Sequence, residues 1–208
     1  MRSVAAVEAE PGEQPTVVAT VSDAGSKGTR AFQLISTVLK NAAWKREDVD
    51  AIAVGLGPGS YHGVRVAIAI AQGWSVARQV RLIGVSSVDA LAAMIALKGQ
   101  QEPFAVAIDA QRGDFYRADY MVESGVARAV GTLRLVKAAD IEQCLKSAKN
   151  VFGPDLPDRL PGVREAFPVA ATVGFLAAKM PIETSGASLE PIYLRETAFV
   201  KAPPPRFA

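Results

Sequence analysis

The fold is decided by residues 51–78, AIAVGLGPGSYHGVRVAIAIAQGWSVAR. The first four residues form a continuous apolar run, which is typical of a β-strand covered on both faces. A glycine-rich turn follows over residues 55–60, and the spacing of the apolar residues then predicts a helix over residues 63–78. A second strand over 82–85 and a helix that opens at residues 86–89, SSVD, come next. This order of strands and helices predicts α/β packing with some parallel pairing.

The helix over residues 63–78 carries apolar residues on two sides. One side comprises Val64, Ala67, Ile68, Ala71 and Trp74, and the opposite side comprises Val66, Ile70, Gly73 and Ala77. A surface helix of a monomer shows one apolar stripe, so this helix is either sandwiched within the chain or packed against another protein. Its small residues would let a partner helix approach closely. Because the domain is small, we favour a partner.

The segments before and after this stretch complete the α/β pattern. Residues 4–7 and 16–21 predict an opening β-hairpin, and residues 29–40 predict a helix with Thr29 as its cap. We place a boundary in the polar segment 98–103, between an N-terminal domain of residues 1–100 and a smaller C-terminal domain of residues 101–208. The C-terminal domain is expected to contain strands over 104–108, 115–122 and 132–136, helices over 138–148 and 169–180, an irregular proline-rich segment over 153–168, a strand-like end over 191–195 and a loose tail around 203–205.

The composition predicts a soluble globular protein. Half of the 208 residues are hydrophobic, 21% are charged, and the net charge is +2. The most apolar run, residues 64–71, is far shorter than the ~20 residues of a transmembrane helix, and the N-terminus has no secretory pattern. A single cysteine, Cys144, suits a reducing cytosol, so we expect a cytoplasmic protein without membrane contact. The balanced charge gives no sign that this chain alone holds nucleic acid.

The turn Gly57-Pro58-Gly59-Ser60 is the most pointed local motif. A glycine-rich turn before a helix can present backbone N–H groups to an anion. Ser60 is followed by Tyr61, however, so the turn is not a phosphate-binding P-loop, and residues 79–81 lack the acidic residue of a dinucleotide fingerprint. We favour a turn shaped for tight packing of strand and helix. The alternative is a nucleotide-binding enzyme that uses this turn.

Other reactive side chains are better explained as structural residues. His62 is the only histidine, so a metal site built from two or more histidines is excluded. Ser60 lacks a separate catalytic base, and Cys144 falls between apolar residues of a predicted helix, where it is expected to be part of the core. Three aspartates, Asp109, Asp114 and Asp119, could form a carboxylate cluster, but we favour a turn residue and solvated strand positions.

Four blocks of sequence carry a more specific signal. In chain order they are residues 52–65 (IAVGLGPGSYHGVR), 84–91 (GVSSVDAL), 108–116 (IDAQRGDFY) and 191–195 (PIYLR). Together they resemble the TsaB family, a subunit of bacterial tRNA threonylcarbamoyladenosine biosynthesis that was once described as a glycoprotease homologue. The resemblance implies an actin/hexokinase-like α/β fold of two related lobes, with mixed sheets flanked by helices and the second lobe reduced.

The resemblance also implies a role. A TsaB-like chain would be a non-catalytic scaffold or activating subunit that binds a TsaD-like catalytic subunit through helices of its first lobe. With a TsaE-like ATPase and ATP, the assembly would transfer a threonylcarbamoyl group to the tRNA adenosine beside the anticodon. The complex would use the ATP, no cofactor would be bound by this chain alone, and tRNA would be reached only indirectly. The free chain could form a homodimer.

The expected site residues follow from the two-sided helix and the resemblance together. The partner interface would comprise Phe32, Ile35, Leu39, Gly63, Val64, Ala67, Ile70, Ala71 and Trp74, and the signature loop would comprise Gly57, Pro58, Gly59, Ser60 and Arg65. No catalytic residue and no metal ligand is expected.

The first 45 residues depart from the family pattern. The family's first strand usually ends in Asp-Thr-Ser, whereas Glu8-Ala9-Glu10 stand here, and Gly28-Thr29 replace a His-Ser pair. Two carboxylates in a phosphate-binding loop would repel a nucleotide, so independent ATP binding is disfavoured.

Overall fold

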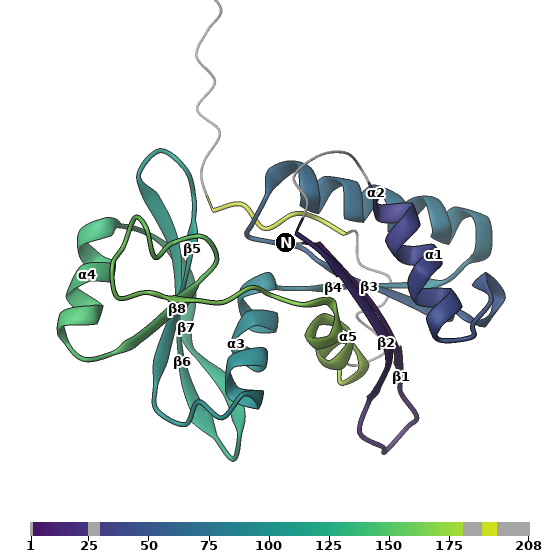
Figure 1. Cartoon of the computed structure of the whole chain (residues 1–208), viewed down its shortest axis with the longest axis horizontal. Coiled ribbons are helices and arrows are strands. Elements are labelled where there is room, and N and C mark those ends of the chain that lie inside the picture. Colours follow the sequence, from purple (N-terminus) through teal and green to yellow (C-terminus); the bar gives the residue numbers. More distant parts are fainter. Residues whose placement is uncertain (1, 25–29, 181–188, 195–208) are drawn as a thin grey trace, which may run out of the picture.

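Two lobes lie side by side along the longest axis of the molecule (Figure 1). The computed structural model describes residues 2–24, 30–180 and 189–194. Each lobe is built around its own β-strands, and helices cover the faces of those strands.

The first lobe contains two pairs of strands. The hairpin of β1 (Arg2–Glu8) and β2 (Thr16–Asp23) is antiparallel, with an irregularity between Ala6 and Val7. The other pair, β3 (Ala51–Gly55) and β4 (Arg81–Val85), is parallel. Both pairs were expected from the sequence, and the parallel pair confirms the strand–helix–strand pattern of residues 51–85.

The second lobe holds a five-stranded mixed sheet in the order β7-β6-β5-β8-β9. Its strands are β5 (Phe104–Asp109), β6 (Asp114–Glu123), β7 (Val126–Lys137), β8 (Asn150–Gly153) and β9 (Arg164–Glu165). Strands β5, β6 and β7 are antiparallel neighbours, whereas β8 runs parallel to β5 and β9 parallel to β8.

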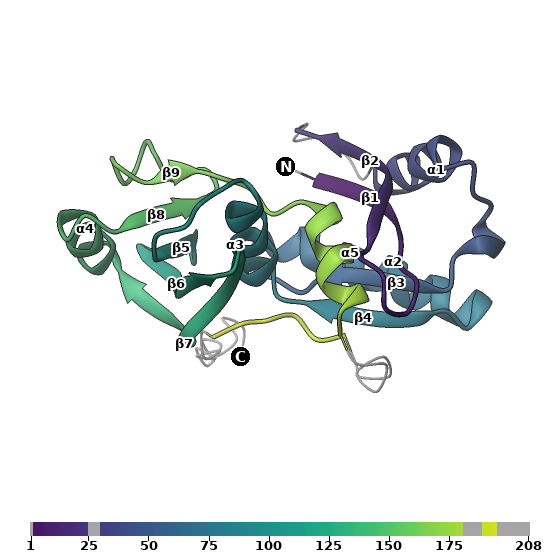
Figure 2. The same ribbon diagram turned by 90° about the horizontal axis from the view of Figure 1, so that it is seen from below.

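Helices cover both sides of the strands in each lobe. They are α1 (Ala31–Asn41), α2 (Tyr61–Arg78), α3 (Ser87–Leu97), α4 (Ala138–Lys146) and α5 (Ala170–Ala178), with a short 3-10 helix η1 (Arg46–Asp48) before β3. In the first lobe α1 packs on the β1–β2 hairpin and α2 on β3 and β4, while α5 lies on the other side of these strands (Figures 1 and 2). In the second lobe α3 and α4 build separate apolar cores with the sheet.

Packing crosses the predicted boundary between residues 100 and 101. Helix α3 precedes that boundary, but its buried residues pack against β5 and β6 of the second lobe. Helix α5 follows the boundary, yet it packs against the strands of the first lobe. Gly174 shows how closely it does so, since a Cβ there would lie 2.7 Å from Val7 Cγ2. The chain therefore returns to the first lobe after completing the second.

The structure corrects several details of the sequence-based expectations. Helix α2 begins at Tyr61 rather than Gly63, and β7 begins at Val126 instead of residue 132. Strands β8 and β9 were not expected. The strand predicted at the C-terminal end is wrong for residues 191–194, which have no regular secondary structure. Thr29 lies outside the described residues, and Arg30 occupies the N-cap position of α1 without a side-chain cap.

Within the described segments, no helix is both long enough and apolar enough to span a lipid bilayer.

Candidate partner interface and signature loop

Helix α2 buries only one of its two apolar sides in its own lobe. Ile68 and Ala71 are buried and pack with Val54 of β3, and Leu189 from the end of the chain completes this core. Val64 and Ala67 lie at its margin, partly buried, together with residues of β3 and β4.

The other side of α2 is open. Ala69, Gly73 and Ala77 are exposed, and Val76, on the same face as the exposed Arg65 and Gln72, is 87% exposed. Ile70 on this side and Trp74 at the edge of the covered side are half-buried. The two-sided sequence pattern thus corresponds to one side buried in the lobe and one side that is only partly covered, since Gly73 and Ala77 are exposed while Val66 and Ile70 are half-buried.

The open side of α2 forms an apolar groove with α1. The groove has a volume of about 520 Å³ and is lined by Phe32, Ile35, Ser36, Arg46, Ala69, Ile70, Gly73, Trp74, Ala77 and Arg78. Phe32, in the first turn of α1, is 66% exposed. An exposed phenylalanine beside small residues gives a protein partner an apolar anchor and space for close approach.

Two arginines lie in the groove, as does a tryptophan N–H without a hydrogen-bond acceptor in the described part of the chain. Arg78 forms an ion pair with Glu47, with 3.1 Å between Nη1 and Oε1, and Arg46 adds a second cation. The indole Nε1 of Trp74 is buried and has no hydrogen-bond partner among the described residues. A buried donor without an acceptor costs about 1–3 kcal/mol, so a rearrangement that supplied an acceptor would be favourable.

The structure brings together only part of the predicted interface set. Phe32, Ile35, Ile70 and Trp74 meet in the groove. Ala71 does not, because it is 1% exposed inside the lobe, and its assignment to a surface interface is corrected. Val64 and Ala67 face the same core. Gly63 is exposed near the start of α2, and Leu39 is half-buried on α1 outside the groove lining.

The signature loop connects β3 with α2 and is fixed by internal hydrogen bonds. Gly57 has φ +91°, a conformation that favours glycine, and the Gly57–Pro58 peptide bond is cis. The Gly57 N–H donates to Ser87 Oγ (3.1 Å), and the Ser87 N–H donates to the Gly57 carbonyl (2.8 Å). Ser60 caps α2, since its Oγ accepts from the N–H of Gly63 (3.3 Å). The loop therefore locks a strand to two helices, as the tight-packing interpretation expects.

Three of the four sequence blocks of the resemblance meet at this loop. Besides Ser87 from the second block, Ile192 from the fourth donates its N–H to the Leu56 carbonyl (2.9 Å). Gly84 permits close packing, because a Cβ there would lie 2.4 Å from Leu56 Cδ1. Tyr116 of the third block lies near enough to Tyr193 to contribute to its electrostatics. Segments far apart in sequence thus form one continuous region.

Aromatic residues and an arginine lie beside the loop. The rings of Tyr61 and Tyr193 stack with centroids 5.6 Å apart, and both side chains are substantially exposed. The Arg65 guanidinium lies 4.7 Å from the Tyr61 ring centroid and donates to its hydroxyl. Burial raises the pKa of the Tyr193 hydroxyl, while Arg65 acts to lower it. His62, exposed, meets the edge of Tyr61.

The remaining candidate residues are engaged in structural contacts. Asp109 is the last residue of β5, next to the expected turn, and its carboxylate accepts from the Gln111 N–H (2.8 Å). Asp114 and Asp119, expected to be solvated, are instead largely buried and ion-paired. Cys144 is buried in the core beneath α4, as expected. In the part of the chain that the structure describes, no three His, Cys, Asp or Glu residues gather as a metal site.

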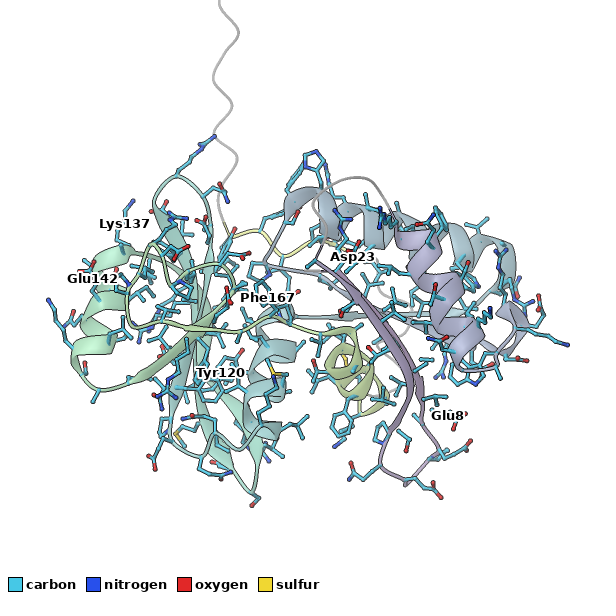
Figure 3. All side chains as sticks on the ribbon, in the orientation of Figure 1. Glu8, Asp23, Tyr120, Lys137, Glu142 and Phe167 are labelled. Carbon is cyan, nitrogen blue, oxygen red and sulfur yellow. The ribbon has the colours of Figure 1, made fainter. Side chains whose placement is uncertain are left out.

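Glu8 marks the departure from the family pattern. It is the last residue of β1, and in Figure 3 it lies on the side of the first lobe away from α2.

Comparison with known proteins identifies the family. The family model described as TsaD: tRNA N6-adenosine threonylcarbamoyltransferase matches residues 28–152, more than half of the chain. The tRNA threonylcarbamoyladenosine biosynthesis protein TsaB of Escherichia coli (strain K12) is 26% identical over 84% of this chain and 83% of its own. TsaB of Buchnera aphidicola subsp. Schizaphis graminum is 30% identical over 58% of each chain. A crystal structure from Pseudomonas aeruginosa, of an uncharacterized protein similar to peptidase YeaZ, superposes with TM-score 0.66 at 28% identity over 80% of this chain and 83% of that one.

The two lobes and these matches define an α/β protein of the actin/hexokinase-like class. Within that class, the chain belongs to the TsaB family of tRNA threonylcarbamoyladenosine biosynthesis proteins. This membership places it in a tRNA-modification pathway.

Proposed function

We propose that this chain is a non-catalytic subunit that binds and activates a TsaD-like catalytic partner through the groove between α1 and α2. The observation that carries the proposal is the uncovered apolar side of α2. Ala69, Gly73 and Ala77 are exposed next to Phe32, so contact with another helix would remove a continuous apolar surface from water. The small side chains allow that helix to approach closely.

The chemistry of the signature loop supports a non-catalytic role. Pro58 has no N–H group, the Gly57 N–H is bound to Ser87, and the Ser60 hydroxyl accepts from the α2 backbone. Pro58 and Gly57 therefore offer no free N–H group to a phosphate, which weakens this loop as an anion site. The ATP of the reaction is assigned to the complex, together with a TsaE-like ATPase.

Reconstitution tests the proposal. The TsaD-like and TsaE-like proteins of the same organism would be incubated with unmodified tRNA, ATP and the remaining substrates, with and without this chain. Nucleoside mass spectrometry would measure threonylcarbamoyladenosine. We expect modification to depend on this chain and to be lost when Ala77 is replaced by Glu. Full modification without the chain would refute the role.

Calorimetry of the isolated chain addresses the enzymatic alternative. Titration with ATP and with NAD should give no measurable heat of binding. Tight binding of either nucleotide by the chain alone would favour a nucleotide-binding enzyme instead.

A further inference from the structure

A network of charged side chains lies on the outer hairpin of the second lobe, far from the groove. Its centre is Asp119 on β6, whose side chain is 11% exposed. Three cations surround this single carboxylate. Arg117 Nη2 lies 2.8 Å and Lys149 Nζ 2.5 Å from Oδ1, while Arg134 Nη2 lies 2.7 Å from Oδ2.

The cations of this network outnumber its carboxylates. Burial alone would raise the pKa of Asp119, but hydrogen bonds from Arg117 and Lys149 lower it below its usual value, so the group is ionised at neutral pH. Asp140 on α4 also acts electrostatically on Arg117. Even with Asp140 included, three positive charges face two negative ones. A partly desolvated excess of positive charge favours a bound anion.

Two of the three cations are accessible to such an anion. Arg134 is 55% exposed and Lys149 about half as much, whereas Arg117 is largely buried. Within the described ranges, only one nitrogen of the Arg134 guanidinium has a hydrogen-bond partner. Because Arg134 and Lys149 hold the two different oxygens of one carboxylate, their head groups lie close together on either side of it. Two cationic head groups beside the same carboxylate can both donate to the oxygens of one phosphate group.

The position of the network leaves it free when a partner binds the groove. Strand β7, which carries Arg134, is the edge strand of the second lobe's sheet. Figures 1 and 2 show this strand in the lobe opposite the one that carries α1 and α2.

We propose that Arg134 and Lys149 form a direct contact for a phosphate group of the RNA backbone. The choice of RNA as the polyanion rests on the proposed role in tRNA modification, whereas the phosphate chemistry rests on the network itself. The near-neutral composition of the chain is compatible with one such contact. Arg117, Arg134 and Lys149 are spread over 33 positions of the sequence, and the fold brings them together. The contact adds to, and differs from, the expectation that RNA is reached only through the partner.

The test measures tRNA binding by the full-length chain alone, so it does not depend on partner docking. Fluorescence anisotropy with labelled tRNA would be recorded at several salt concentrations for the wild type and for the Arg134→Gln/Lys149→Gln variant. Loss of two phosphate contacts should weaken binding about tenfold at low salt and reduce the slope of log K against log salt by about 1.5. The control is Lys40→Ala/Arg81→Ala, which removes two exposed cations from the first lobe and should change the affinity less than about twofold.

Thermal melting would verify that both double variants are folded; Arg117 still pairs with Asp119 in the first of them. If the control loses as much affinity as the test variant, binding is nonspecific and the site is refuted. Unchanged tRNA binding in the test variant refutes it too, and the expectation of indirect contact then stands. Competition by polyglutamate as strong as by RNA of equal charge would identify an acidic-peptide site and overturn the assignment to RNA.

Discussion

Helices α2 and α3 share several sequence features but have different surroundings. Each follows a parallel strand, starts at a serine N-cap, and is apolar on more than one side. In α3 seven residues are buried, since the helix lies between the sheet of the second lobe and α5. In α2 only Ile68 and Ala71 are buried. The apolar sides of a helix can therefore be removed from water in two ways, by residues of the same chain or by another molecule.

The largest difference in stability should be seen between two variants that place a carboxylate on opposite sides of α2. Ala71→Glu places a carboxylate in a closed core and should destabilise the fold by about 4 kcal/mol or more, because an unpaired buried charge has no compensation. Ala77→Glu lies on the open side and should leave stability nearly unchanged. Urea unfolding followed by circular dichroism compares the two. A similar loss of unfolding free energy in both variants would show that Ala77 is also buried in the folded chain.

Truncation of one aliphatic side chain in each helix extends the comparison of stability to α3. Leu91→Ala in α3, which empties a fully buried site, should reduce the free energy of unfolding by about 3 kcal/mol. Val76→Ala in α2 removes exposed methyl groups and should change it by less than about 0.5 kcal/mol. Chemical denaturation measures both. A loss at Val76 comparable with that at Leu91 would contradict the exposure of this side.

A hydrogen bond from a buried tyrosine links α3 to the sheet of the second lobe. The buried Tyr120 hydroxyl on β6 donates to Asp89 Oδ1 (2.7 Å), and Figure 3 shows Tyr120 in the second lobe near α3. Burial raises the pKa of Tyr120 far above its usual value, and Asp89 raises it further. The unfolded chain then ionises first, so stability present below about pH 10 is lost as the pH rises above it.

Tyr120→Phe should cost about 1 kcal/mol at pH 7 and remove the alkaline loss specific to this group. Melting temperatures from pH 7 to 11 test this. Parallel curves for the wild type and the variant would show that the tyrosine does not titrate as described.

The serine caps should give the smallest and most similar effects. Ser60→Ala in α2 and Ser86→Ala in α3 each remove one acceptor for a first-turn N–H, at 3.3 and 3.4 Å, and should each cost about 1 kcal/mol or less. Thermal melts of the two variants provide the measurement. A much larger loss at Ser60 would indicate that the signature loop has a role beyond capping.

Local pattern predicted most of the elements and the two apolar sides of α2. It did not predict which side faces the core, because Leu189, more than a hundred residues away, closes the covered side. For that reason the pattern alone does not show that Ala71 is buried, nor that Gly73 and Ala77 line the groove. The place of Arg46 in the groove lining is likewise not predictable from the sequence, since only the fold brings η1 beside α2.

Long-range contacts also explain why Asp114 and Asp119 are largely buried and not solvated as the sequence predicts. Asp119 alternates with apolar residues along β6, a pattern typical of a solvated strand position. In the folded chain it is paired with Arg134 and Lys149, which are 15 and 30 residues further along the chain. No spacing rule connects residues at those separations. The strand β8 was missed because it is short and lies beside proline-rich sequence.

The most direct test of the central claim is the affinity of this chain for its TsaD-like partner, measured by isothermal titration calorimetry with the wild type and Ala77→Glu. We expect a 1:1 complex for the wild type and at least ~100-fold weaker binding for the variant, whose melting temperature should match that of the wild type. Equal affinities of the two folded proteins would contradict the claim that the open side of α2 receives the partner.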